Sequence, residues 1–294
     1  MLQIKAQTPP YTYIPDAQNW DCGFSPAKMN QLSADTGFMN SMARYNSNIN
    51  NPLLKAFPVP AGPYIVPVVF HLIDATTPTI PYAQIQWQMA RLNAAFANQM
   101  NLFNGQANSP HGVNTQIEFR LACVAQNSLS AWTSSVEPGV MRYATTNTVV
   151  LNQGVAPSAT TADLLAITHP TAFPTTFPFA NYLNIWCVPN IGPGNVAGYG
   201  TFPVGTFGGI DGIVMRLEMI GNNSYPTNFN MFSQLDKGSI LAHEVGHYLG
   251  LYHTFESMPA LSGVLGCYGT TPTDATTDGD LLLDTPPTMY AQDL

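Results

Sequence analysis

The sequence predicts an α+β fold, with a twisted and mostly parallel sheet of five strands, a backing helix and a second helix that carries a histidine motif. Two observations predict this fold. Strand-like apolar runs alternate with helical spacing between residues 64 and 250, and this order favours parallel pairing. Hydrophobic residues make up 45% of the 294 residues, enough for a large core. Turn formers dominate after Gly250, so we expect an irregular C-terminal part.

Apolar runs and helical spacing define the elements along the chain. The β-rich run from Tyr64 is typical of a buried strand. Ile85, Met89 and Leu92 recur at helical spacing. Gly250 is expected to end the last helix, because glycine readily adopts the positive φ of a helix terminus. The predicted elements are the strand Tyr64–Ile73, the helix Tyr82–Met100, the strands Ile117–Val124 and Tyr182–Val188, the short edge strand Gly198–Phe202, the strand Ile210–Leu217 and the helix Gln234–Leu249.

Three segments differ in composition. Residues 1–60 are rich in Pro, Asn, Tyr and Met and show little periodicity, so we interpret them as an N-terminal, prosegment-like leader. Residues 61–250 form the main domain and end with the histidine helix. Residues 251–294 begin a C-terminal subdomain.

The low charge excludes several classes of protein. Charged residues make up 9% of the chain, against about 25% in ordinary soluble domains. With 9 Lys and Arg and a net charge of -8, we expect no nucleic-acid partner and no polybasic membrane contact. No apolar run reaches the roughly 18 residues of a spanning helix, so we expect no membrane insertion. The polar, weakly charged composition favours an extracellular location, although no signal peptide is visible in this chain.

A metal-binding motif stands out at His243-Glu244-Val245-Gly246-His247. Residues four apart share one face of a helix, so His243 and His247 can hold one ion. Gly250 allows a sharp turn that returns His253 as a third nitrogen ligand. Three imidazoles with an open position describe a catalytic zinc site rather than a closed structural one.

The alternative interpretation of this motif is a chance match. A lone HExxH occurs by chance often enough that it is only weak evidence for a metal site. The extended pattern has five fixed positions, and three of the six histidines of the chain fall in it. We therefore favour zinc. His71 lies inside an apolar strand and is interpreted as a core histidine with satisfied hydrogen bonds.

The extended motif resembles that of the metzincin metalloproteases. Further segments resemble the pappalysin family, in its ulilysin and cytophagalysin branch. They are VPVVFHLI at Val66–Ile73, IQWQMARLNAAFA at Ile85–Ala97, IEFRLA at Ile117–Ala122, YLNIW at Tyr182–Trp186, DGIVM at Asp211–Met215, HTFE at His253–Glu256 and GDLLLDTPP at Gly279–Pro287.

The resemblance implies a metzincin-type zincin fold, split by a cleft whose floor is the zinc helix. It implies an antiparallel edge strand that pairs with an extended peptide substrate, here through Gly198, Tyr199, Gly200 and Thr201. The alternative for this strand is a short protected edge. The family also carries a Met-turn well beyond the DTP segment. Met289 lies too close to that segment to fill this role, so the C-terminal subdomain is expected to be incomplete, or to be completed by another segment.

The motif and the resemblance together predict a zinc endopeptidase that acts on proteins or peptides. Glu244 is the expected general base, which takes a proton from a metal-bound water and returns it to the leaving amine. The alternative is a catalytically inactive binding module on a metalloprotease scaffold, and the short C-terminal part motivates it.

Calcium is a second expected ion. Asp280 and Asp284 lie in a Thr- and Gly-containing acidic loop, and the resemblance places calcium beside the DTP segment. The alternative is a solvated acidic turn.

Cys22 precedes a glycine in the leader, and the pappalysin resemblance implies a cysteine switch there. Its thiolate would occupy the open zinc position, and the enzyme would be a latent proenzyme until the leader is cut at Arg44 or Lys55. The alternatives are a free thiol or a disulfide with Cys123, Cys187 or Cys267.

Overall fold

The chain divides into two compact units in the computed structural model, which describes part of each unit. The first unit comprises residues 1–23, 61–201 and 208–245, and the second comprises 24–60, 202–207 and 246–294. The sheet belongs to the first unit and the helix α2 (Thr36–Ile49) to the second. The described residues are 21–22, 36–49, 62–74, 80–102, 107–122, 137–144, 150, 163–164, 181–192, 196–200, 212–222 and 237–254.

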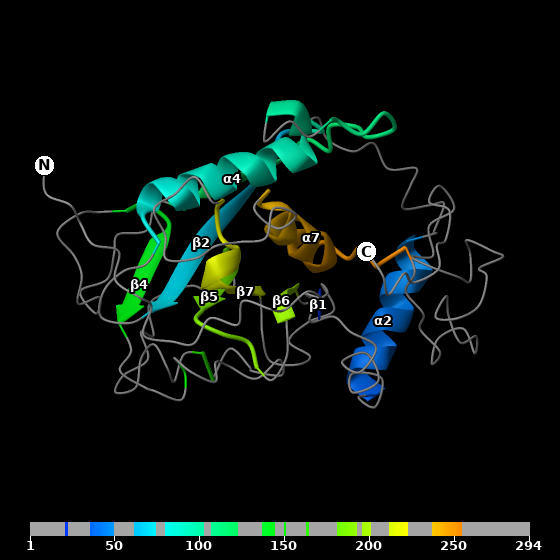
Figure 1. Cartoon of the computed structure of the whole chain (residues 1–294). Helices are drawn as coiled ribbons and strands as arrows, with labels where there is room; N and C mark the ends of the chain where they lie inside the picture. Colours follow the sequence, from blue (N-terminus) through cyan, green and yellow to red (C-terminus); the bar gives the residue numbers. More distant parts are fainter. Residues whose placement is uncertain are drawn as a thin grey trace, which may run out of the picture. The chain divides into compact units, whose positions relative to one another are not determined.

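One mixed sheet forms the centre of the first unit (Figure 1). Its order is β1-β6-β7-β5-β2-β3, and β4 also pairs with β2. The β6–β7 pair is antiparallel and the other described pairs are parallel, which confirms the predicted sheet with its antiparallel strand. The strands are β1 (Asp21–Cys22), β2 (Tyr64–Asp74), β3 (Ile117–Leu121), β4 (Val140–Ala144), β5 (Leu183–Val188), β6 (Val196–Gly200) and β7 (Ile213–Arg216).

The described sheet has seven strands where the sequence predicted five, because β1 and β4 were missed. The five residues of β4 pair with the second half of β2, along the same side on which β3 pairs with the first half. The prediction of an edge strand at Gly198–Phe202 is wrong for the described sheet, because the two residues of β1 pair with β6 and β6 is therefore not the outermost strand. The predicted boundaries of the three domains stay a prediction.

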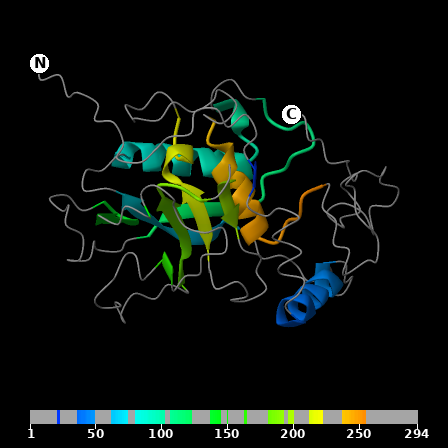
Figure 2. The ribbon, with the colours of Figure 1, turned by 60° about the horizontal axis from the view of Figure 1, so that its bottom comes forward.

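Two helices lie on one face of the sheet, α4 (Tyr82–Phe96) and α7 (Ser239–Tyr248), as Figure 2 shows. Both are shorter than predicted, and short 3-10 turns, η1 (Met100–Leu102) and η3 (Leu217–Met219), follow α4 and β7. Asn93 of α4 both donates to and accepts from the backbone of Phe119, at 2.9 and 2.8 Å. These two bonds satisfy the outward backbone groups of β3 and fix α4 to the end of the sheet.

The opposite face of the sheet holds His71, which is fully buried. Its Nε2 donates to the side-chain oxygen of Asn184 at 3.0 Å, and its Nδ1 lies 3.2 Å from the Tyr143 hydroxyl. The ring stacks on Trp186 with 4.0 Å between centroids. The prediction of a core histidine with satisfied hydrogen bonds is confirmed.

A buried ion pair joins Arg216 of β7 to Glu218 of η3, with 2.5 Å between Nη2 and Oε1. The two side chains are 1% and 3% exposed. Burial raises the pKa of Glu218 to about 7, and the neighbouring Arg216 only partly offsets this. The cost of removing the Glu218 carboxylate from water therefore exceeds its attraction to Arg216.

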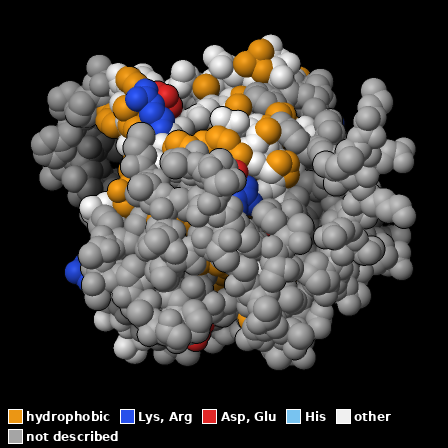
Figure 3. Space-filling view, turned by 90° about the vertical axis from the view of Figure 1, so that its left-hand side faces the viewer, with side chains coloured by type: hydrophobic (Ala, Val, Ile, Leu, Met, Phe, Trp, Pro, Cys, Tyr) orange, Lys and Arg blue, Asp and Glu red, His pale blue; other side chains and the backbone are white. Residues whose placement is uncertain are grey.

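The surface agrees with the low charge of the sequence. On the face in Figure 3, the described surface is mainly apolar or uncharged, with few acidic or basic side chains. None of the helices in the described ranges has the length and hydropathy needed to cross a bilayer.

Glu218→Gln is expected to remove one component of the pH dependence of stability. A carboxyl group whose pKa is raised on folding stabilises the fold at low pH, and this contribution is lost as pH rises through about 7. The free energy of unfolding of Glu218→Gln, relative to wild type, should therefore increase from pH 5.5 to 8.5, by about 2 kcal/mol. Urea unfolding at each pH measures it.

The matched control is Glu118→Gln in the exposed pair with Arg120, where side-chain hydrogen bonding lowers the pKa of Glu118. Glu118 is ionised throughout that pH range, so this difference should stay constant. A constant difference for Glu218→Gln as well would contradict the assignment.

Candidate metal centre

The histidine motif lies on α7 and on the turn that follows it. Leu241 and Val245 are fully buried and fix one side of the helix. His243 and His247 are four residues apart and so share another side. Gly250 has a φ of 98°, as expected for the residue that ends the helix.

The turn after α7 is a Schellman motif. The Gly250 N–H donates to the His247 carbonyl at 2.8 Å, and the Leu251 N–H donates to the Gly246 carbonyl at 2.9 Å. This pair of bonds satisfies carbonyls at the helix end and reverses the chain. The reversal brings His253 back beside His247.

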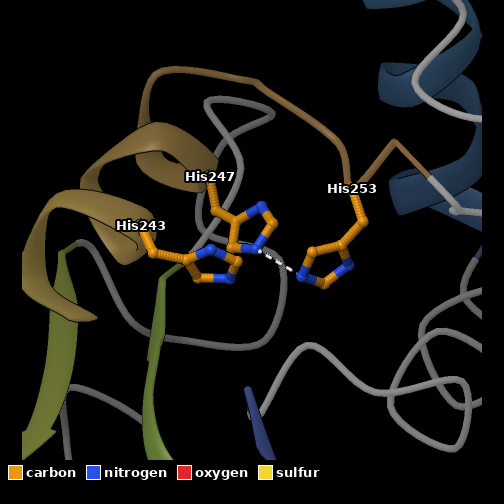
Figure 4. A group of neighbouring side chains, drawn as sticks. All are labelled: His243, His247 and His253. Carbon is orange, nitrogen blue, oxygen red and sulfur yellow. Dashed lines mark hydrogen bonds between the residues drawn. The ribbon is translucent and has the colours of Figure 1, made fainter. Parts of the chain in front are cut away.

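Three imidazoles converge as a result (Figure 4). One ring nitrogen each of His243, His247 and His253 lie within 4.8 Å of one another. The Nε2 atoms of His247 and His253 are 3.1 Å apart. Two nitrogens at about 2.0–2.1 Å from one tetrahedral zinc ion would be about 3.3 Å apart. The donor set and its spacing therefore fit zinc.

A backbone carbonyl orients the middle histidine. Nδ1 of His247 donates to the Leu251 carbonyl at 2.7 Å, so the proton of the neutral ring lies on Nδ1 and Nε2 keeps its lone pair. Sequence reasoning missed this contact because it uses a backbone atom. The available signal was the position of Leu251, directly after the glycine that ends the helix.

Glu244 is 1% exposed, and β6 packs against its side chain. A Cβ added at Gly198 would lie 3.3 Å from Cγ of Glu244 and 3.0 Å from the Val214 carbonyl oxygen. A glycine at this position thus lets β6 approach α7 closely. Of the predicted substrate-binding residues, Gly198, Tyr199 and Gly200 lie in β6, and Thr201 lies outside the described residues.

The strand β1 runs along β6 on the side away from β7. Cys22 is paired with Gly198 in a parallel register, so its backbone lies one strand away from the residue that contacts Glu244. The thiol of Cys22 is not among the described atoms. Asp280, Asp284 and Met289 also lie outside the described residues. The structure thus brings the three histidines together and leaves the other predicted ligands as predictions.

The sequence of the chain is similar to those of extracellular metalloproteases, although no protein-family model matches it. One from Arthroderma otae is 27% identical over 220 residues, which cover 74% of this chain and 56% of that protein. One from Pyricularia oryzae is 32% identical over 107 residues, which cover 35% and 29%. The chain thus spans about half or less of the length of these relatives.

Two solved structures from Tannerella forsythia are also similar. A promirolysin variant has 23% identity and a TM-score of 0.57, over 91% of this chain and 83% of that one. Mature mirolysin, in complex with a cleaved peptide, has 24% identity and a TM-score of 0.47, over 79% and 82%. The promirolysin match shows that this chain has the fold of promirolysin, which confirms the metzincin-type fold expected from the motifs.

Gly250→Ala is expected to weaken metal binding about tenfold. A left-handed conformation costs a residue with a Cβ about 1–2 kcal/mol, and relaxation of the turn moves His253 away from His247. Titration of the metal-free chain with zinc against a chromogenic chelator measures the affinity.

Gly246→Ala is the control, because a Cβ there would meet nothing closer than Leu251 Cδ1 at 3.8 Å. Alanine is about 1 kcal/mol more favourable than glycine inside a helix. The substitution therefore does not disturb α7, and this variant should bind zinc as well as wild type. Equal affinities for wild type and Gly250→Ala would contradict the role of the turn.

Proposed function

We propose that this chain carries the catalytic centre of a zinc-dependent metalloendopeptidase that hydrolyses peptide bonds of protein substrates. The observation that carries the proposal is the convergence of three imidazoles within 4.8 Å beside the buried carboxylate-bearing residue Glu244. The names of the two relatives support it, since both are extracellular metalloproteases. The same names and the polar, weakly charged composition support an extracellular location.

His243, His247 and His253 would each give one nitrogen to the ion. A zinc ion held in this way supplies a Lewis acid that polarises a peptide carbonyl and makes a coordinated water acidic near neutral pH. The Leu251 carbonyl keeps the His247 ring in the tautomer that can bind. The buried side of α7 holds the first two histidines in a fixed relative position, because Leu241 and Val245 are fully buried.

Glu244 would move the protons. Its carboxylate accepts a proton from the attacking water and returns it to the amine that leaves the cleaved bond. The residue follows His243 directly, so it points to a different side of α7 and does not compete for the metal. Its low exposure places it in a dry environment, where a charged group acts strongly on nearby dipoles.

The strand β1 supports a latent form of the enzyme. A substrate that adds to the outer edge of β6 would need the position that β1 holds beside Gly198. A Cys22 thiolate on the zinc would at the same time fill the open ligand position. Removal of the leader would then free both the strand edge and the metal.

The position of helix α2 bears on which of the two predicted residues is the cleavage site that removes the leader. Arg44 lies within this helix and is exposed, yet proteases bind their substrates in extended form. A cut at Arg44 would require local unfolding of α2. Of the two predicted positions, we therefore favour Lys55, which lies outside the described residues. The calcium site at Asp280 and Asp284 stays a prediction from the resemblance.

Glu244→Gln is expected to lower peptide hydrolysis at least about a thousandfold while one zinc is retained, because the amide cannot take the proton. Cleavage of a denatured protein after removal of residues 1–55, with and without a zinc chelator, and metal analysis of the same samples measure this. Full cleavage by the zinc-loaded variant would reject Glu244 as the base.

Wild-type protein with one bound zinc and no cleavage, even after removal of residues 1–55, would instead favour the binding module. That alternative keeps the fold and the metal but gives up the reaction.

Cys22→Ala is expected to change the ligand shell of the intact chain. Zinc-edge spectroscopy of wild type should give one sulfur at about 2.3 Å with three nitrogens, and the variant should give only nitrogen and oxygen. Peptide hydrolysis by the uncut variant should rise. Cys187→Ala is the control, because that thiol is fully buried in β5 and burial raises its pKa. A shell of nitrogen and oxygen alone in uncut wild type would exclude the switch.

A further inference from the structure

A row of polar side chains on α4 is completely buried. Gln84, Gln88 and Arg91 are 1%, 0% and 0% exposed, and their spacing of four and three residues places them on one side of the helix. They lie next to the apolar row of the same helix that covers the sheet. Such side chains are seldom buried unless their hydrogen bonds are satisfied, so their partners identify what the row holds.

The partners lie at the start of α7 and just after η3. Gln88 donates to the Gly238 carbonyl at 3.0 Å and accepts from the Gly221 N–H at 2.9 Å. Arg91 donates from Nε to the Lys237 carbonyl at 2.6 Å, and from Nη2 to the Ser239 hydroxyl at 3.1 Å. Three consecutive residues, 237–239, are therefore bound to α4 where α7 begins.

The contact at Gly238 leaves no room for a side chain. Its φ is 64°, and a Cβ there would lie 2.8 Å from Cζ3 of Trp87 and 3.0 Å from Cγ of Arg91. The backbone before α7 thus lies directly on α4, and its distance from α4 is set by van der Waals contact.

The charge of Arg91 does not stabilise α7. The amino end of a helix carries a partial positive charge, so a guanidinium at this end is unfavourable, and a hydroxyl or carboxylate cap would serve better. Burial also lowers the pKa of Arg91. A guanidinium supplies a rigid planar fork, which holds the Lys237 carbonyl and the Ser239 hydroxyl at fixed relative positions.

We infer that Arg91 and Gln88 are positioning residues that set the axial place and rotation of the first turn of α7, and through them the place of Glu244. This inference rests on the proposed function. Glu244 follows Ser239 by about 7.5 Å of helix rise. A rotation of about 20° moves a carboxylate about 6 Å from the axis by about 2 Å, and a shift of about 1 Å can cost a hundredfold in rate. On the side of the sheet, Gly198 of β6 lies close to the Glu244 side chain and restricts its position.

The test uses Gln88→Met and Arg91→Lys in the full chain, with Gln86→Met as control. Gln86 is exposed on the same helix, so this control makes the same chemical change away from α7. The measurements are amide hydrogen exchange of 239–245 in the metal-free chain, the visible spectrum of the cobalt-loaded chain, and, after removal of residues 1–55, kcat and KM on a peptide.

Both test variants should keep one metal. Their amide exchange in 239–245 should be at least about tenfold faster than in wild type, while exchange in the rest of the chain stays at the wild-type rate. Their cobalt bands should shift, and kcat should fall at least about tenfold with KM within threefold. Gln86→Met should match wild type in every measurement.

Exchange in 239–245 and cobalt bands equal to wild type in both variants would overturn the inference. A uniform rise in exchange over the whole chain would also overturn it, because it would indicate a general structural role. Absence of peptide hydrolysis in wild type from which residues 1–55 have been removed would count against the proposed function alone, since exchange and the cobalt spectrum still decide the role of Arg91 and Gln88.

Discussion

The left-handed turn at Gly250 is the constraint on which the candidate centre depends. A helix presents two histidines four residues apart, but it cannot by itself present a third nitrogen at the same point in space. The positive φ of Gly250 and its bond to the His247 carbonyl end α7 and reverse the chain within two residues. The reversal does two things at once. It brings Nε2 of His253 to 3.1 Å from Nε2 of His247. It also places the Leu251 carbonyl where it accepts from Nδ1 of His247 and orients that ring. Ligand position and ligand tautomer thus have one geometric origin.

The ten residues of α7 are too few to form a stable helix alone, so tertiary contacts must define where it lies. Those contacts are of two kinds. Leu241 and Val245 provide apolar burial, which is strong but tolerates sliding and rotation. The bonds from Gln88 and Arg91 to residues 237–239 are directional and define a single register. A catalytic helix needs both, because burial gives stability and directional bonds give the sub-ångström placement that chemistry requires.

Sequence reasoning succeeded where one residue type carried the information. The apolar runs of β2 and β5, the spacing in α4 and the glycine that ends α7 are local signals, and the structure has each of them. It failed where the partner carried the information. The two residues of β1 and the five of β4 are strands because β6 and β2 offer them edges. Gln84, Gln88 and Arg91 have the composition of a solvated face, and they are buried because residues 220–221 and 237–239 supply hydrogen-bond partners. The helix α2 was not predicted, because residues 1–60 as a whole show little periodicity.

The proposed latency can be judged from the size of β1. Within the described part of the chain, β1 contributes two paired residues with a register shift between Asp21 and Cys22, and each of their few hydrogen bonds to β6 is worth about 0.5–1.5 kcal/mol net. Strand pairing of that length cannot by itself keep a substrate from the edge. A thiolate–zinc bond is far stronger, but it requires that the sulfur be delivered to the metal, and the parallel pairing of Cys22 with Gly198 places its backbone beside the strand that contacts Glu244. In the proposed latent form the two interactions would be complementary, because the strand would supply the position and the metal bond would supply the energy.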